Sequence, residues 1–196
     1  MKRLPFAVLL VSSLSLAALV VPGPVRAAEE PRPKLDHAQL IAAAREIIAA
    51  QTYCALITLD QEGRPQVRTM NPFPPEEDMT VWFATNTRSR KVQEMRRDPR
   101  VVLYYANHKE ATGYVALSGR AVLIDDMQEI LKRKRAYWDQ AFPGLKNLVL
   151  IKVVPERLDV LNYAKGALGD ELTWRTPSIE LGAAGPKETG PAKAMP

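Results

Sequence analysis

The stretch Thr80–Arg97, TVWFATNTRSRKVQEMRR, decides how the chain is organised. It opens with the apolar run Val81–Ala84, which is rich in β-formers and predicts a strand buried on both faces. Polar residues then interrupt the apolar pattern, and good helix formers follow from Ser89 onward. Either Thr87 or Ser89 is placed to cap this helix. The stretch therefore predicts a strand, a polar turn and a helix.

The charges at the start of this helix are the opposite of those that a helix N-terminus favours. Its first turn carries partial positive charge and favours Asp or Glu, whereas the chain places Arg88, Arg90 and Lys91 there. A bound anion, held by N–H groups, hydroxyls and these cations, would compensate for the repulsion. A solvent-exposed basic turn that tolerates some repulsion explains the same residues, and the stretch alone leaves both explanations open.

The N-terminal residues have the pattern of an export signal. Lys2 and Arg3 precede an apolar run over 6–21, and small residues follow helix breakers near Ala27 and Ala28. The apolar run is short for a membrane span. We expect cleavage after Ala27 or Ala28, a Sec-type route to the periplasm or the exterior, and no stable membrane insertion afterwards.

The basic character of the chain comes partly from this signal. The formal charge is +5, and removing residues 1–28 takes away three cations and no acid, which leaves +2. Such a small excess gives no reason to expect nucleic-acid binding.

The cysteine and histidine content argues against a disulfide or a metal centre. Cys54 is the only cysteine, and its place within an apolar strand pattern predicts a buried thiol. His37 and His108 are far apart in sequence and have no cysteine beside them, so we expect no zinc site and disfavour haem.

The remaining patterns predict one domain of six or seven strands and three helices. Asp36-x-x-Gln39 and Asp126-x-x-Glu129 resemble capping boxes that open the first and third helices. The predicted boundaries are a leader at 29–35, the domain at 36–175 and a disordered tail at 176–196. The predicted strands cover 53–60, 65–73, 81–84, 100–106, 113–124 and 148–154 with an extension over 158–162, and the third helix covers 126–141.

Short links between these strands favour antiparallel pairing, and Gly119 within a long strand suggests a bulge in a curved sheet. A small closed barrel is the natural architecture for such a sheet.

Three stretches resemble the FMN-binding split barrel of pyridoxamine 5'-phosphate oxidase and its relatives, including the general stress proteins. They are Gly63–Met70, Phe83–Lys91 and Tyr114–Ala121, and the resemblance covers roughly Asp36–Asn162. It implies a mainly β fold with flanking helices, a six- to seven-stranded antiparallel split β-barrel, with FMN as the cofactor. It also implies a homodimer that holds the flavin at its interface.

The resemblance assigns two groups of residues to FMN. The group that would hold the phosphate is Arg68, Ser89, Arg90 and Lys91, which agrees with the misplaced helix charges. The group that would lie along the flavin is Thr69, Met70, Thr85 and Asn86. Tyr114 falls where some members present a flavin contact, although a tyrosine of the barrel wall is an equally good interpretation.

The chain departs from the true oxidase where the oxidase binds its substrate. Phe73 stands in place of a lysine, and Lys132 and Ala136 stand nearest the tyrosine and arginine of the late helix. The Arg-x-His pair near the end of the oxidase is missing, since residues 161–175 contain no histidine. We therefore do not expect oxidation of pyridoxamine phosphate.

Two classes of function remain. One is a flavin-dependent oxidoreductase of the cell envelope, acting with an unknown small-molecule substrate or electron donor; the sequence singles out no catalytic acid or base. The other is a non-enzymatic flavin carrier or sensor, or a barrel that has lost its flavin. A deazaflavin or haem could replace FMN within the same fold.

Overall fold

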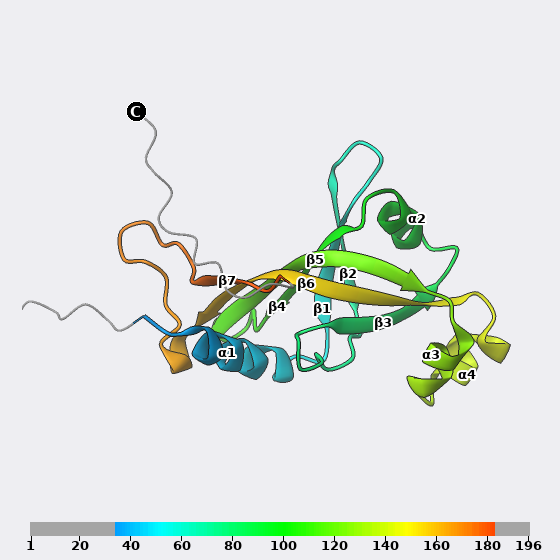
Figure 1. Ribbon diagram of the computed structural model, residues 1–196, viewed down its shortest axis with the longest axis horizontal. Helices are drawn as coiled ribbons and strands as arrows, with labels where there is room; N and C mark the ends of the chain where they lie inside the picture. The colour runs from blue at the N-terminus through cyan, green and yellow to red at the C-terminus, as the bar shows by residue number, and fades with distance from the viewer. Residues whose placement is uncertain (1–33, 183–196) are drawn as a thin grey trace, which may run out of the picture. The chain divides into compact units, whose positions relative to one another are not determined.

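The computed structural model describes residues 34–182, and Figure 1 shows their helices and strands. The strands are β1 (Cys54–Leu59), β2 (Pro65–Met70), β3 (Val81–Asn86), β4 (Arg100–Ala106), β5 (Gly113–Ile124), β6 (Leu148–Asn162) and β7 (Ser178–Glu180). The α-helices are α1 (His37–Ala49), α2 (Arg90–Arg97), α3 (Met127–Lys132) and α4 (Trp138–Ala141), with short 3-10 helices at Pro143–Leu145 and Tyr163–Lys165.

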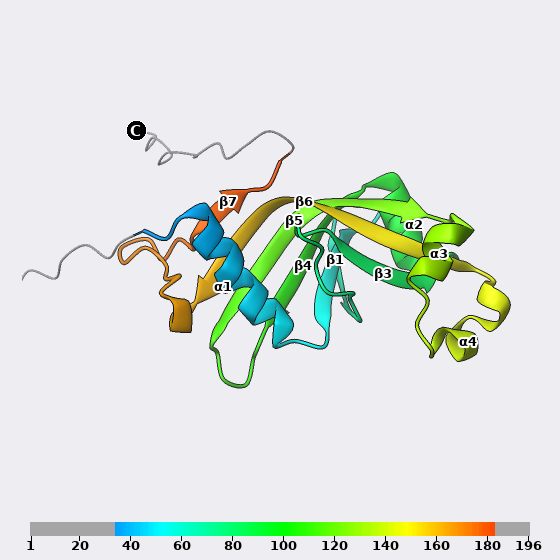
Figure 2. The ribbon, with the colours of Figure 1, turned by 60° about the horizontal axis from the view of Figure 1, so that its bottom comes forward.

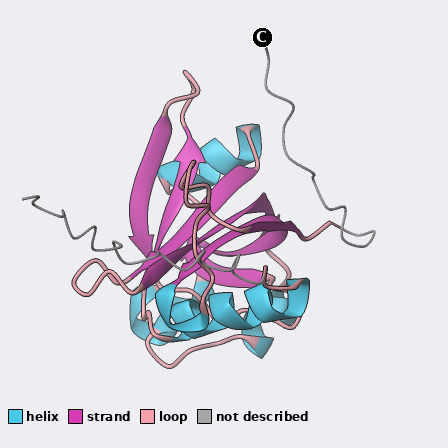
Figure 3. Ribbon diagram, turned by 90° about the vertical axis from the view of Figure 1, so that its left-hand side faces the viewer, coloured by secondary structure: helices cyan, strands magenta, loops and turns pink. Residues whose placement is uncertain are grey.

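All strand pairs are antiparallel, and the sheet has the order β2-β1-β4-β5-β6-β3, with β7 also on β6. The strands curl into a half-barrel, as a split barrel requires, so that part of the prediction is confirmed (Figure 3). The closed barrel predicted from the strand pattern alone is wrong for a single chain. Strands β2 and β3 are the two ends of the sheet and do not pair with each other. The segment that joins them contains Pro72, Pro74 and Pro75, which have no N–H to donate to a ladder.

Alternating burial along the strands builds the main core. Cys54, Leu56 and Thr58 of β1 are buried, and the residues between them are half-buried. The apolar face of α1 covers β4, β5 and β6, as Figure 2 shows. The predicted capping box at the start of α1 is present, because Asp36 and Gln39 exchange hydrogen bonds of 2.8 and 2.9 Å.

The strand expected to be buried on both faces is β3. Val81 and Phe83 enter the main core, whereas Trp82 points to a second cluster that contains Trp138 of α4. Strand β6 is shared in the same way, since Val149 belongs to the main core and its neighbours Leu148 and Leu150 to the second cluster. The continuous apolar pattern therefore reflects two cores, one on each side of the sheet.

The bulge expected at Gly119 is confirmed. The register of β5 on β6 shifts between Ser118 and Gly119, leaving Glu156 as the extra residue of β6. A Cβ atom at Gly119 would lie 2.2 Å from the carbonyl oxygen of Val154, so the two backbones can approach only because a glycine is there.

The single helix predicted for 126–141 is wrong, because the structure has α3 and α4 with a break between them. Asp126 caps α3 as expected, accepting a hydrogen bond of 2.9 Å from the amide of Glu129. In the break, Arg133 stacks on Trp82 at 3.7 Å and Arg135 on Phe73 at 3.8 Å. These tertiary contacts override the helix propensity of the segment between α3 and α4.

The ordered domain extends beyond the predicted boundary at residue 175. Strand β7 pairs with Arg157–Asp159 of β6, and the amide of Leu181 donates to the carbonyl of Glu156 at 2.7 Å. The tail predicted from 176 is therefore wrong over its first residues, because Ile179 and Leu181 pack against the main core.

The predicted signal peptide and residues 29–33 of the leader lie outside the described residues, as do 183–196. Within 34–182, no helix has the length and apolarity that crossing a bilayer requires.

Candidate functional site

The centre of the site is Arg68 on β2, which the strand period places on the same face as Gln66 and Met70. Its guanidinium reaches across β1, donating to Thr58 Oγ1 at 2.5 Å, and also donates to Glu94 Oε2 of α2 at 2.7 Å. Two bonds to two different elements fix the orientation of this side chain.

Glu94 is the acidic residue that holds the cations together. Its side chain is 4% exposed, and its Oε2 atom also accepts a hydrogen bond of 2.5 Å from Thr58. Its Oε1 atom lies 3.0 Å from Arg90 Nε as an ion pair without the alignment of a hydrogen bond. A carboxylate at this depth needs such partners, since burying it unpaired would be costly.

The N-terminus of α2 contributes the other cations. Ser89, one of the two predicted candidates, occupies the N-cap position, yet its hydroxyl makes no capping bond. The Oγ atom is buried without a hydrogen-bond partner in the described part of the chain. The first N–H groups of any helix have no acceptor within the helix. This end of α2 therefore presents donors that an anion could satisfy.

Lys91 adds a half-buried ammonium group to this end. It donates to Thr85 Oγ1 at 3.0 Å, which joins the end of β3 to α2. Burial lowers the pKa of Lys91, and the positive charge of Arg68 lowers it further, while Glu94 acts in the opposite direction. The ammonium is thus held where positive charge is already concentrated, as a site for an anion requires.

Arg68, Arg90 and Lys91 together line an open pocket of about 250 Å³. We call these three cations with Ser89 the cradle. Counting Glu94, three positive charges face one negative charge, so the site matches the charge of an ionised phosphate monoester. Of the misplaced helix charges, Arg88 and Arg90 are exposed and Lys91 is half-buried. The arrangement supports the anion explanation over an exposed basic turn, because Lys91 and Arg90 line one pocket with the partly buried Arg68 of β2.

The other predicted site residues are placed differently. Met70 is buried on the Arg68 side of β2, whereas Thr69 points to the opposite, exposed face. Asn86 lies at the end of β3 and uses its side chain to accept from the Arg88 amide at 2.8 Å. Of these, Thr85 alone is bonded to a cradle cation.

Tyr114 is not brought to the cradle within one chain. It is the second residue of β5, three strands away from β2, and pairs with Ala106 and Leu161. Its hydroxyl is 2.6 Å from Thr176 Oγ1, and its ring lies 5.5 Å from that of Tyr104. In this chain Tyr114 is a residue of the sheet's outer face.

Sequence reasoning missed Glu94 and Thr58, which position Arg68. A signal for Glu94 existed, because it lies four residues after Arg90, the spacing of a helical ion pair. Thr58 lies two residues after Leu56 and therefore on the same, inward face of β1 by the strand period. Neither pattern shows that the two side chains meet, which depends on how α2 packs on β1.

A metal centre finds no support in the described residues, where no three potential metal-ligating side chains cluster. Cys54 is buried beside Tyr105, and burial raises the pKa of its thiol to about 12. The buried thiol expected from the strand pattern is therefore confirmed.

The chain matches known proteins at the level of a family and of solved structures. The family model described as pyridoxamine 5'-phosphate oxidase matches residues 40–162. No curated protein has a sequence that matches the chain significantly.

Three solved structures illustrate the range of similar folds. General stress protein 26 of Bacillus anthracis is 22% identical with a TM-score of 0.54, over 64% of this chain and 95% of that one. An FMN-binding, pyridoxamine 5'-phosphate oxidase-related protein of Nostoc punctiforme is 20% identical with a TM-score of 0.51, over 74% and 95%. A heme binding protein of Mycobacterium smegmatis is 17% identical with a TM-score of 0.54, over 77% and 60%. At these identities the similarity establishes the fold.

Proposed function

The chain belongs to the pyridoxamine 5'-phosphate oxidase family, and we propose that it is an exported FMN-binding protein that acts as a flavin-dependent oxidoreductase on a small molecule. The observation that carries the proposal is the cradle, where three cations line one pocket beside the N-terminus of α2 and the buried Ser89 hydroxyl has no partner within residues 34–182. A phosphate monoester accepts hydrogen bonds from cationic side chains, hydroxyls and helix N-terminal N–H groups of this kind.

The residues present fit the phosphate end of FMN. Arg68 and Lys91 would bind it from fixed positions, Arg90 from the rim of the pocket, and Ser89 through its free hydroxyl. When bound, the isoalloxazine ring supplies the redox chemistry, accepting a hydride from a donor and passing electrons to an acceptor. The part played by this chain is to bind and orient the cofactor.

Oxidation of pyridoxamine phosphate is not part of the proposal. Phe73, at the position where the oxidase carries a lysine, packs edge-on against Trp138 at 6.1 Å and beneath Arg135. Here Phe73 packs, partly buried, against the second core cluster. Lys132 is exposed and pairs with Glu129 at 3.8 Å.

A non-enzymatic flavin carrier or sensor is the second candidate. The observation that favours it is that the carboxylate of Glu94, beside the cradle cations, is already held by Arg68, Thr58 and Arg90. A flavin spectrum that persists through dialysis while no donor is turned over would support a carrier. A haem spectrum after purification, or retention of a deazaflavin instead of FMN, would assign another cofactor to the same fold.

The test is to reconstitute the mature protein, from Ala28 onward, with FMN and to record its absorbance after desalting. Retained flavin bands that a reductant bleaches and an acceptor restores support the proposal. A colourless protein, with FMN recovered in the wash, contradicts it.

A double variant, Arg90→Ala with Lys91→Ala, tests the cradle itself. The loss should amount to several kcal/mol of FMN affinity, at roughly 1.5–3 kcal/mol for each charge-assisted hydrogen bond. The variant should still fold, because Arg90 is 72% exposed and Glu94 keeps its hydrogen bonds to Arg68 and Thr58 when Arg90 is removed. Arg96→Ala, an exposed arginine of the same helix, is the matched control and should bind FMN as the wild type does. Unchanged affinity in the double variant would show that the phosphate binds elsewhere.

A further inference from the structure

The three cations of the cradle repel one another while no anion is bound. Arg68, Arg90 and Lys91 line one pocket of about 250 Å³, which brings their positive charges close together. The two guanidinium groups stay protonated at any ordinary pH. Of the three, only Lys91 can relieve the repulsion, by losing its proton. An empty cradle therefore needs a counter-charge if its ammonium group is to stay charged.

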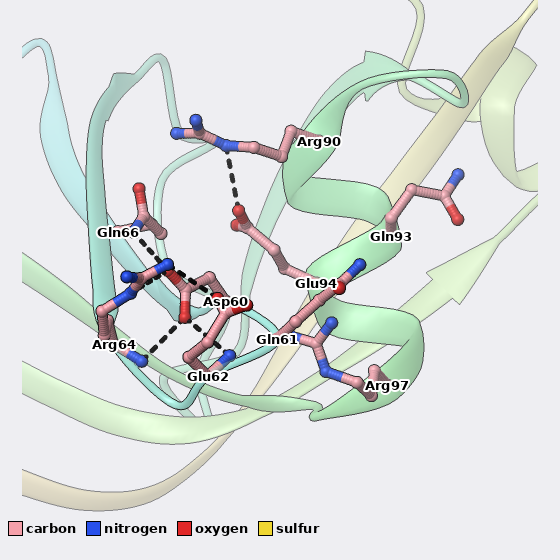
Figure 4. Close-up of a pocket in the computed structure, with 9 residues that line it drawn as sticks. All are labelled: Asp60, Gln61, Glu62, Arg64, Gln66, Arg90, Gln93, Glu94 and Arg97. Atoms are coloured by element: carbon pink, nitrogen blue, oxygen red, sulfur yellow. Dashed lines mark hydrogen bonds and ion pairs between the residues drawn. The ribbon is translucent and has the colours of Figure 1, made fainter.

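Glu94 places a negative charge among these cations. Figure 4 shows its side chain pointing from α2 toward Arg90, whose Nε atom lies 3.0 Å from Glu94 Oε1. The other carboxylate oxygen, Oε2, accepts a hydrogen bond of 2.7 Å from Arg68 of β2. One buried carboxylate thus contacts two of the three cations, and it lies three residues after the third, Lys91, on the same helix.

Thr58 closes these contacts into a ring. Its hydroxyl accepts a hydrogen bond from Arg68 and donates its own proton to Glu94 Oε2, both at 2.5 Å. Arg68 is also bonded to Glu94, so three side chains from β1, β2 and α2 hold one another. Thr58 and Glu94 are buried and Arg68 is partly buried. The position of the carboxylate is therefore set by the fold and does not depend on a ligand.

The groups that face Lys91 come from three elements. Burial lowers the pKa of Lys91 most, the charge of Arg68 on β2 lowers it further, and the charge of Glu94 on α2 raises it. From β3, Thr85 accepts a hydrogen bond of 3.0 Å from the ammonium group and does not titrate. Glu94 thus acts against both effects that favour loss of the proton.

The carboxylates of the β1–β2 hairpin are paired elsewhere. The hairpin faces α2 across a second pocket of about 350 Å³, shown in Figure 4. Within the hairpin, Arg64 pairs with Asp60 at 2.9 Å and with Glu62 at 2.7 Å. Neither carboxylate contributes to the pKa shift of Lys91. The hairpin therefore does not replace Glu94 as a counter-charge.

We propose that Glu94 is a positioning residue of the cradle: its carboxylate acts through Lys91, as the built-in counter-charge that keeps the ammonium group protonated until a phosphate binds. The inference rests on the proposed function, because it takes the cradle to be the site of the flavin phosphate. Glu94 moves the loss of the Lys91 proton to higher pH, and the entering phosphate meets a site that is already charged and oriented.

The experiment follows the ionisation of Lys91 in the ligand-free mature protein. The chemical shift of the lysine ε-carbons, enriched in ¹³C, is recorded against pH, and Lys91→Arg identifies the signal. In Glu94→Gln the midpoint of Lys91 should shift to lower pH, because the carboxamide keeps the size of the side chain and removes the charge that opposes Arg68.

Two variants separate the charge of Glu94 from its structural role. Thr58→Val breaks the same ring and keeps the carboxylate, so its Lys91 midpoint should equal that of the wild type. Glu77→Gln makes the same chemical change at an exposed position before β3, whereas Thr85 lies near the end of that strand. This variant should also leave the Lys91 midpoint in place.

A further pair of variants serves if Glu94→Gln fails to fold, which its melting curve shows. The comparison is then made between Arg68→Gln and Arg68→Gln/Glu94→Gln. The double variant removes both members of the buried ion pair, which costs less stability than removing one of them. The Lys91 midpoint should again be lower in the variant that lacks Glu94.

FMN affinity, measured by flavin fluorescence, connects this midpoint to binding. The affinity should begin to fall at a lower pH in Glu94→Gln than in the wild type. Lys91→Arg/Glu94→Gln should lose this fall, because its guanidinium stays charged.

The outcomes separate this inference from the proposed function. An unchanged Lys91 midpoint in Glu94→Gln would overturn the inference. An equal shift in Thr58→Val would overturn it too, because the cause would then be lost structure and not lost charge. These measurements need no flavin. The expected shift in a protein that binds no FMN would contradict the proposed function and leave the coupling of Glu94 to Lys91 in place.

Discussion

Lys91 is the residue whose chemistry gives the site a pH dependence. Its pKa is lowered by burial and by the charge of Arg68, so its ammonium loses a proton at lower pH than that of a free lysine. A bound phosphate would favour the ammonium and raise the pKa again. Binding therefore takes up a proton over the interval between the two pKa values, and FMN affinity falls as pH rises through it.

Measuring FMN affinity against pH in the wild type and in Lys91→Arg tests this dependence. The guanidinium stays charged, so the variant should keep a nearly constant affinity where that of the wild type falls. Ionisation of the flavin ring affects both proteins equally and cancels in the comparison. Parallel curves would show that Lys91 does not contact the phosphate.

The residues of the cradle and its partner Glu94 could be predicted from the sequence to different degrees. Arg90 and Lys91 were indicated by a physical conflict, since cations at a helix N-terminus need an explanation. Glu94 offered no conflict, because a glutamate among arginines on a helix is usually a solvent-exposed pair partner. Its burial depends on the contact with Thr58 of β1, which no local pattern contains.

At the scale of the elements, the bulge between β5 and β6 requires a glycine at position 119. Gly119→Ala would place a Cβ atom 2.2 Å from the backbone oxygen of Val154, so the strands would have to separate. Overpacking of this kind costs about 1–3 kcal/mol of unfolding free energy. Thermal or denaturant unfolding should show that loss, whereas Gly182→Ala, with nothing within 4 Å, should show none.

An unchanged stability in Gly119→Ala would mean that the bulge relaxes without cost and that Gly119 is not required there. The comparison with Gly182→Ala removes the general effect of replacing a glycine on the unfolded chain.

Local sequence patterns predicted the helices and strands correctly where the two faces of a segment have different surroundings. The strand period located β1, β4 and β5, and the capping residues located the start of α1. The prediction failed over 126–141 because Arg133 and Arg135 leave the helix to stack on aromatic rings contributed by distant residues. It also failed at β7, because the apolar stretch around Ile179 is too short to predict a strand. Ile179 is held by pairing with β6 and by packing against the main core.

At the scale of the whole molecule, the open half-barrel leaves an apolar row on its outer face. Val67 of β2 lies opposite Ile57 of β1, which lies opposite Val102 of β4. Val67 is 63% exposed, which is unusual for an apolar side chain in the middle of a strand. We propose that this row is the surface on which the homodimer implied by the family resemblance would form.

Light scattering coupled to size exclusion should therefore give a mass of two chains for the mature protein. Val67→Lys should shift the mass toward one chain, because a lysine in the row would have to lose its hydration in the dimer. Thr52→Lys adds the same charge at an exposed position just before β1 and should remain dimeric. A wild-type protein with the mass of one chain would contradict the proposal.

The two-sided pairing of β6 also determines when this protein can fold. Strand β6 separates β5 from β3 in the sheet, and Asn162 at its end donates to the carbonyl of Ala43 on α1, 119 residues earlier. Before β6 leaves the ribosome, β3 and β5 have no strand to join them and α1 lacks part of the surface it covers. Contacts between such distant residues form slowly, since a long loop must close first. The complete fold, with β3 paired in the sheet and α1 covering β6, can therefore form only after most of the chain has been synthesised.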